Sequence, residues 1–120
     1  MIIVGSTNAD VGIQQGMDIL KNGGSAMDAV EATIRLVEDN PDDHTVGYNS
    51  YPNILGDLQL DASIMDGATL ETGAVAAMQG FREAISIARR VKDNLPHVYS
   101  PVKELNDSQR RWDSRNRPIC

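Results

Sequence analysis

The chain has 120 residues, of which 41% are apolar and 23% charged, so it can bury one small core and is too apolar to be disordered throughout. Aromatic residues make up only 4% of the chain, and the core is therefore expected to be aliphatic. The net charge of −6 is unevenly spread: residues 1–100 carry 14 acidic and 6 basic side chains (−8), and residues 101–120 carry 5 basic and 3 acidic ones (+2). Such an acidic body repels phosphate backbones, which disfavours nucleic acid as a partner.

Composition also predicts the cellular location of the chain. No apolar run approaches the length of a membrane helix, and no basic leader precedes the apolar residues 2–4. The single cysteine, Cys120, allows neither an intramolecular disulfide nor a zinc site built from cysteines. We therefore expect a cytoplasmic chain that does not contact membranes.

The first expected elements are a strand and a helix. Residues 2–4 form a short apolar run that ends at Gly5, which is typical of a buried strand. Ile13, Met17 and Leu20 then follow at helical spacing. Gly23 is expected to end this helix with a positive φ.

The strongest helix signal begins at Ser25. Its side chain can cap the free amides, and Asp28 three residues later nearly completes a capping box. The residues expected on the buried face are Met27, Val30, Ile34 and Val37. Glu38 is expected on the polar face, and a polar loop over residues 41–57 follows.

The second half of the chain predicts a hairpin and a last helix. Residues 58–65 alternate apolar with polar, Asp66 and Gly67 form a turn signal, and residues 69–78 supply a second strand. A helix is expected from Phe81 to Val91. The order β-α-α-loop-β-β-α predicts an α/β fold in residues 1–100, followed by a polar and mobile tail over residues 101–120.

Several short motifs occur in order between residues 1 and 99. They are GGSAMDAVE (23–31), DHTVGY (43–48) with PN (52–53), LDASIMDG (60–67), GAV (73–75), and IARRV (87–91) with PHV (96–98). Together they resemble the first part of the α chain of glycosylasparaginases and related type 2 asparaginases. The resemblance implies a partial αββα layer fold of the N-terminal-nucleophile hydrolase kind.

The same resemblance implies an amidohydrolase. In that family a threonine at the start of a second, β chain attacks the side-chain amide of glycosylasparagine, asparagine or an isoaspartyl dipeptide. No segment here matches the nucleophile motif, and residues 101–120 are unrelated to the family. The expectation is therefore a chain with no catalytic residue, metal or cofactor of its own, which takes a small amide substrate only when a β chain completes it.

Two residues are implied to bind substrate. Thr45 takes the place of a serine in the family's substrate loop, and Asn8 follows Ser6-Thr7 where the family has a tryptophan near the substrate. A competing interpretation makes Thr45 the nucleophile, because DHTVG resembles the nucleophile motif with its first two residues exchanged. The flanking Tyr48 and the PN pair favour the substrate loop.

Other candidate sites have simpler interpretations. Asp42, Asp43 and His44 are consecutive, so they cannot all face one metal ion, and we interpret them as loop caps. His97 is interpreted as a packing residue.

Two alternatives for the whole chain stay open. It is either part of an interrupted or split amidohydrolase, or a non-catalytic truncated paralogue or frameshifted product that acts as a binding or assembly module. In both cases a hairpin without partners is expected to self-associate through its exposed strand edges. The apolar face expected to be uncovered carries Leu58, Leu60, Ala62 and Ile64.

Overall fold

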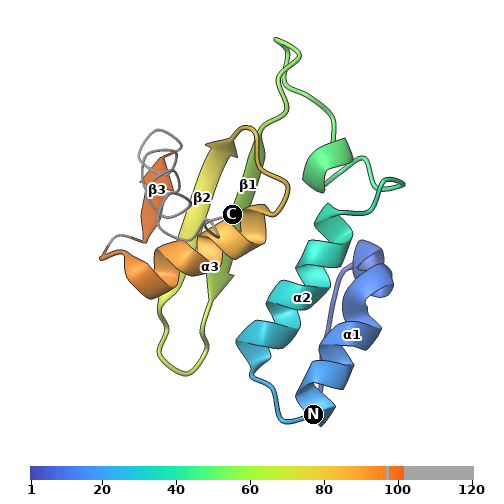
Figure 1. Ribbon diagram of the computed structural model, residues 1–120, viewed down its shortest axis with the longest axis vertical. Coiled ribbons are helices and arrows are strands. Elements are labelled where there is room, and N and C mark those ends of the chain that lie inside the picture. Colours follow the sequence, from blue (N-terminus) through green and yellow to red (C-terminus); the bar gives the residue numbers. More distant parts are fainter. Residues whose placement is uncertain (97, 102–120) are drawn as a thin grey trace, which may run out of the picture.

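The computed structural model describes residues 1–96 and 98–101, which form a mixed α/β structure (Figure 1). The elements are η1 (Thr7–Ala9), α1 (Asp10–Lys21), α2 (Ala26–Glu38), η2 (Gly47–Asn49), β1 (Leu60–Met65), β2 (Thr72–Met78), α3 (Ala84–Asn94) and β3 (Tyr99–Pro101). The expected α/β class is confirmed. Strand β3 was not expected from the sequence. His97 and residues 102–120 of the expected tail lie outside the described residues.

Helices α1 and α2 pack as a pair with their backbones in close contact. Gly12 and Gly16 of α1 are buried, and a Cβ at Gly12 would lie 2.5 Å from the carbonyl oxygen of Thr33 in α2. The Thr33 hydroxyl donates to the carbonyl oxygens of Ala29 (2.8 Å) and Gly12 (3.3 Å). Larger side chains at these glycines would therefore force the two helices apart.

The start of α2 agrees with the expectation from the sequence. The Asp28 N–H donates to Ser25 Oγ (3.1 Å), and the Ser25 N–H donates to Asp28 Oδ2 (3.3 Å). This completes the capping box. Gly23 has the predicted positive φ of 84°.

The sheet has the order β1-β2-β3, with β1 antiparallel and β3 parallel to the central β2. The register shifts between the pairs Leu60–Met78 and Ala62–Val75, so β2 carries a bulge. Ala77 in this bulge has a positive φ of 52°, and its N–H donates to Asp61 Oδ1 at 2.6 Å.

Helix α3 lies across one face of the sheet and forms the core with it (Figure 1). The buried residues of this core are Leu60, Ile64, Val75, Met78, Ala84, Ile85, Ile87, Ala88 and Val91, with Met27 and Ile34 of α2 packed against them. The prediction of an uncovered face at Leu60 and Ile64 is wrong, because α3 folds back onto that face. On the opposite face Met65 is 56% exposed.

The strand predicted at residues 2–4 is also wrong. Ile2 and Val4 are each 86% exposed, and no described strand lies beside this segment to share hydrogen bonds with it. Ile3 packs on α1 instead, with its Cδ1 atom 2.8 Å from where a Cβ of Gly16 would lie.

Val30 departs from the predicted buried face of α2, since it is 39% exposed. The fully buried stripe of α2 runs through Ala29, Thr33 and Val37, because α1 covers that side of the helix.

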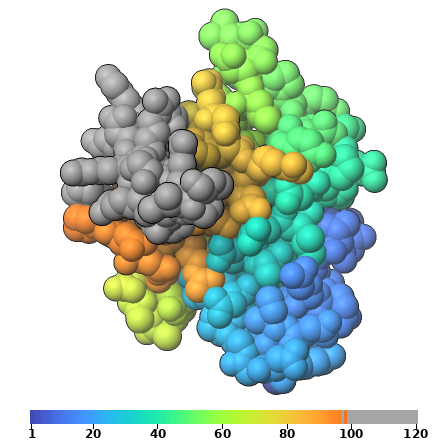
Figure 2. All heavy atoms as spheres, viewed as in Figure 1, coloured from blue at the N-terminus to red at the C-terminus, as the bar shows by residue number. Residues whose placement is uncertain are grey.

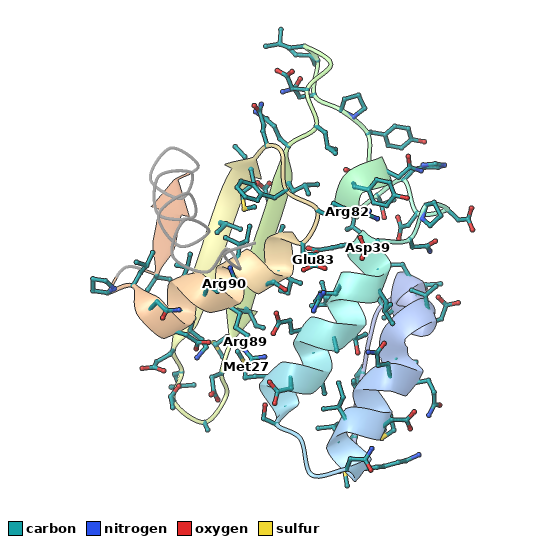
Figure 3. The ribbon with its side chains drawn as sticks, in the orientation of Figure 1. Met27, Asp39, Arg82, Glu83, Arg89 and Arg90 are labelled. Atoms are coloured by element: carbon teal, nitrogen blue, oxygen red, sulfur yellow. The ribbon has the colours of Figure 1, made fainter. Side chains whose placement is uncertain are left out.

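Ion pairs join α2 to α3 at both ends of their contact. Arg82 and Glu83 lie beside Asp39 where α2 ends and α3 begins (Figure 3), and Arg82 Nε is 3.0 Å from Asp39 Oδ1. Further along, Arg89 Nη1 is 2.6 Å from Glu31 Oε2. These contacts fix α3 relative to the end of α2.

The loop between η2 and β1 projects from the molecule, as Figure 2 shows in light green. Asn53 holds the tip of this loop, because its side-chain oxygen accepts the N–H groups of Leu55 (2.9 Å) and Asp57 (3.0 Å). Ile54 and Leu55 at the tip are fully or largely exposed. None of the described helices is long and apolar enough to span a membrane.

Candidate functional site

A cavity of about 430 Å³ lies between β1 and the C-terminal half of α2, with η1 and the loop before η2 at its border. Its lining residues are Ser6, Asn8, Ala9, Thr33, Ile34, Val37, Glu38, Thr45, Val46, Gly47, Ser50, Gln59, Leu60, Asp61, Ala62, Ser63 and Ile85. Both residues that the sequence analysis assigned to substrate, Asn8 and Thr45, line this one cavity. They come from segments far apart in the sequence.

A hydrogen-bonded cluster joins these two residues through Asp43, and we call it the rim cluster (Ser6, Asn8, Asp43 and Thr45). The Asn8 amide donates to Asp43 Oδ2 at 3.1 Å, and the Ser6 hydroxyl donates to Asn8 Oδ1 at 2.5 Å. The N–H and the hydroxyl of Thr45 both donate to Asp43 Oδ1, at 2.7 and 2.5 Å. The cluster fixes η1 against the loop that carries Thr45.

Asp43 is ionised over most of the pH range. Donation from the Thr45 hydroxyl, and then from its N–H, lowers the pKa of Asp43 to about 2. A carboxylate with so low a pKa is a poor general base at neutral pH. Asp43 therefore orients the Thr45 hydroxyl and is not a general base for it.

Glu38, at the C-terminal end of α2, lines the cavity and carries a buried carboxyl group, which we call the floor carboxyl. It is only 6% exposed, its Oε1 accepts the N–H of Ile85 at 3.0 Å, and its Oε2 has no hydrogen-bond partner among the described residues. Burial raises the pKa of Glu38 to about 7, reinforced by the negative charges of Glu83 and Asp39 and opposed by the Ile85 N–H.

The prediction that Glu38 lies on the polar face of α2 is wrong. Glu38 follows Ile34 by four residues, so it lies on the same side of the helix, and it caps the amino end of α3. The sequence signal for the burial of Glu38 was its spacing of four residues from the apolar Ile34. That Glu38 accepts a backbone N–H of α3 could not be predicted without the position of α3.

Gly47, the first residue of η2, packs directly against the backbone of Glu38. It has a positive φ of 76°, and a Cβ at this position would overlap the carbonyl oxygen of Glu38. Next to it, the Tyr48 ring stacks under the Arg82 guanidinium, whose Cζ lies 4.5 Å from the ring centroid. Helix η2 is thus held against the end of α2 and the residues before α3.

The segment 42–44 has no metal-binding arrangement. His44 Nδ1 lies 3.2 Å from the Asn49 carbonyl oxygen, and its ring packs on Tyr51 with centroids 6.0 Å apart. Within residues 1–96 and 98–101, no three His, Cys, Asp or Glu side chains are grouped so that they could hold a metal ion. The contacts of His44 are those of a residue that shapes its own loop.

Comparisons with known proteins agree with the motif resemblance. A family model described as asparaginase matches residues 7–103. The isoaspartyl peptidase/L-asparaginase of Mus musculus is 44% identical over 85 residues, which are 71% of this chain and 26% of the mouse protein. The N(4)-(beta-N-acetylglucosaminyl)-L-asparaginase of Elizabethkingia miricola is 46% identical over 80 residues, which are 67% of this chain and 23% of that protein.

An archaeal relative extends the same pattern. The plant-type L-asparaginase of Pyrococcus horikoshii is 48% identical over 75 residues, which are 62% of this chain and 24% of that protein. The chain spans about a quarter of the length of these relatives.

Proposed function

The chain belongs to the asparaginase family, and from this premise we propose that it supplies one wall of an amidohydrolase site that cleaves a side-chain amide. Asn8 and Thr45 bind the substrate in this proposal. The sheet and α3 would be one αβ half of an αββα arrangement. The candidate substrates are those of the family, namely asparagine, isoaspartyl dipeptides and glycosylasparagine.

The observation that carries the proposal is the rim cluster. The Thr45 hydroxyl donates its hydrogen bond to Asp43, so the lone pairs of Thr45 Oγ1 are available to accept a hydrogen bond from a ligand. Asn8 donates one of its two amide hydrogens to Asp43, and its second amide hydrogen can be donated to a ligand. One acceptor and one donor at the border of a cavity suit an amide, which presents both N–H and C=O groups.

The nucleophile, in this proposal, comes from a second chain. Of the five hydroxyl-bearing residues that line the cavity, three donate within the fold: Ser6 to Asn8, Thr33 to backbone carbonyls, and Thr45 to Asp43. Neither of the other two, Ser50 and Ser63, is paired in the described structure with a histidine or other base that lines the cavity. The outer edge of β1, at residues 59–63, borders the same cavity. A strand from the completing chain could pair with this edge and carry a reactive threonine into the cavity.

Complementation tests the proposal. The chain would be co-produced with the part of the mouse relative that lies beyond its matched 85 residues, and hydrolysis of the three candidate substrates would be measured. We expect activity from the pair, with KM raised about tenfold by Thr45→Ala because one ligand hydrogen bond is lost. Thr69→Ala, in the hairpin turn away from the cavity, is the matched control and should leave KM unchanged.

Activity that is insensitive to Thr45→Ala and Asn8→Ala would contradict the assignment of these residues. A properly folded pair without activity would favour the non-catalytic alternative.

The isolated chain provides a second test. We expect no hydrolysis of any of the three substrates and a single uncut chain in mass spectrometry. Two fragments divided before Thr45 would restore the nucleophile interpretation. We also propose that the isolated chain self-associates through the β1 edge, so light scattering should show dimers or larger species that disappear when the completing chain is added.

A further inference from the structure

The floor carboxyl has one oxygen, Glu38 Oε2, that accepts no hydrogen bond from the described residues. Glu38 is 94% buried, since only 6% of it is exposed, and its Oε1 accepts the backbone N–H of Ile85 at 3.0 Å. Its second oxygen, Oε2, has no partner among the described residues, although the side chain lines a cavity of about 430 Å³. A buried acceptor without a donor is costly, which favours a ligand that supplies one.

The charges around this oxygen favour a cation. No lysine, arginine or histidine is among the described residues that line the cavity, whereas Asp61 is among them. Glu83 and Asp39 face Glu38 from α3 and α2, and their own cationic partners are Arg35 (2.6 Å) and Arg82 (3.0 Å). Figure 3 shows Arg82 beside Asp39 and Glu83 at the junction of the two helices. Since these arginines pair with Glu83 and Asp39, Glu38 itself has no cationic partner among the described residues, and a positively charged ligand in the cavity would supply one.

Part of the lining near Glu38 is apolar. It consists of Ile34 and Val37 of α2, Leu60 of β1 and Ile85 of α3. A volume of this size lies in the usual range for small-molecule sites, which are lined mostly by apolar side chains with a few polar groups. The walls suit a short aliphatic stem next to the charged group.

We propose that this cavity binds a small organic ammonium ion with a short aliphatic stem, and that Glu38 Oε2 is the principal acceptor of its N–H groups. Asn8 and Thr45 of the rim cluster line the same cavity, but this proposal uses Glu38 and the apolar lining residues instead of them. It does not depend on the proposed amidohydrolase function, because all the residues that it uses belong to this chain.

Binding of an ammonium ion should depend on pH. The pKa of Glu38 is raised to about 7, so the carboxyl is largely neutral at pH 6 and largely ionised at pH 8. Only about a tenth of such groups are ionised one unit below their pKa. Since an ammonium ion pairs with the carboxylate, affinity at pH 6 should be about tenfold weaker than at pH 8.

The experiment uses n-butylammonium chloride as the probe and sodium butyrate as the anion of matched shape. The methyl signals of Ile34, Val37, Leu60 and Ile85 are followed by NMR during each titration. We expect saturable shifts with butylammonium at pH 8, affinity about tenfold weaker at pH 6, and no saturable shifts with butyrate.

Two variants identify the acceptor. Glu38→Gln keeps an oxygen for the Ile85 N–H but places an NH₂ donor where Oε2 was, so the fold is retained and butylammonium affinity should fall at least tenfold. Glu71→Gln makes the same chemical change at an exposed site outside the cavity and should leave affinity unchanged. Absence of saturable shifts with butylammonium, equal binding of butyrate, or unchanged affinity in a folded Glu38→Gln variant would each overturn the proposal.

Discussion

The rim cluster and the floor carboxyl hold the same chemical group in two different environments. Asp43 at the rim accepts donors from Thr45 and Asn8 and has its pKa lowered to about 2, while Glu38 at the floor accepts one donor, is buried, and has its pKa raised to about 7. Hydrogen-bond donors lower the pKa of Asp43, and the loss of contact with solvent raises the pKa of Glu38. The cavity therefore joins a fixed anion at its border to a titratable group inside.

The largest expected effect comes from breaking the contact between the two regions. In Gly47→Ala the new Cβ would overlap the Glu38 carbonyl oxygen, and a positive φ of 76° is already unfavourable for alanine. Left-handed strain and overpacking together should lower the free energy of unfolding by about 4 kcal/mol, measured by urea denaturation.

Gly56→Ala is the matched control for this substitution. Gly56 has a similar positive φ of 90°, but no atom lies within 4 Å of the position that its Cβ would take. Only the backbone strain of about 1 kcal/mol should therefore remain. Equal losses in the two variants would show that η2 is not held by α2.

The second prediction concerns the pH dependence of stability. The pKa of Glu38 in the folded chain, about 7, lies above its ordinary value of 4.5, so the folded state holds a proton that the unfolded state releases. The free energy of unfolding should fall by about 3 kcal/mol as the pH rises from 4.5 to 7. Glu38→Gln should remove this slope, and a variant that keeps the slope would assign it to another group.

The third and smallest effect is expected at the rim. The pKa of Asp43 is lowered from 3.8 to about 2, so its contribution to stability is present above about pH 4 and is lost as the pH falls toward 2. Asp43→Asn should remove that acid dependence while changing stability little at neutral pH, because the group is solvated. A large loss of stability at pH 7 would show that the cluster is structural.

The difference between the two regions also explains what the sequence could predict. Ser25 with Asp28, the alternation of residues 58–65 and the positive φ of Gly23 are local signals, and the structure confirms them. Asn8 and Thr45 were assigned to substrate from motifs that lie near each residue; both line one cavity, and their role stays a prediction.

Errors occurred where a distant element decides the environment. Glu38 is buried because α3 returns to the end of α2, and the face of Leu60 is covered by the same helix. Residues 2–4 have strand-like side chains, but they lack a neighbouring strand among the described residues. Burial of a charged group and pairing of a strand both require the tertiary arrangement, which a local pattern does not contain.

The most direct test of this account is an NMR titration that follows the side-chain carboxyl carbons of Glu38 and Asp43 in the same sample. The account predicts a midpoint near pH 7 for Glu38 and near pH 2 for Asp43. Midpoints for both groups near the ordinary value of about 4 would contradict it, because the cavity would then hold two equivalent solvated carboxylates.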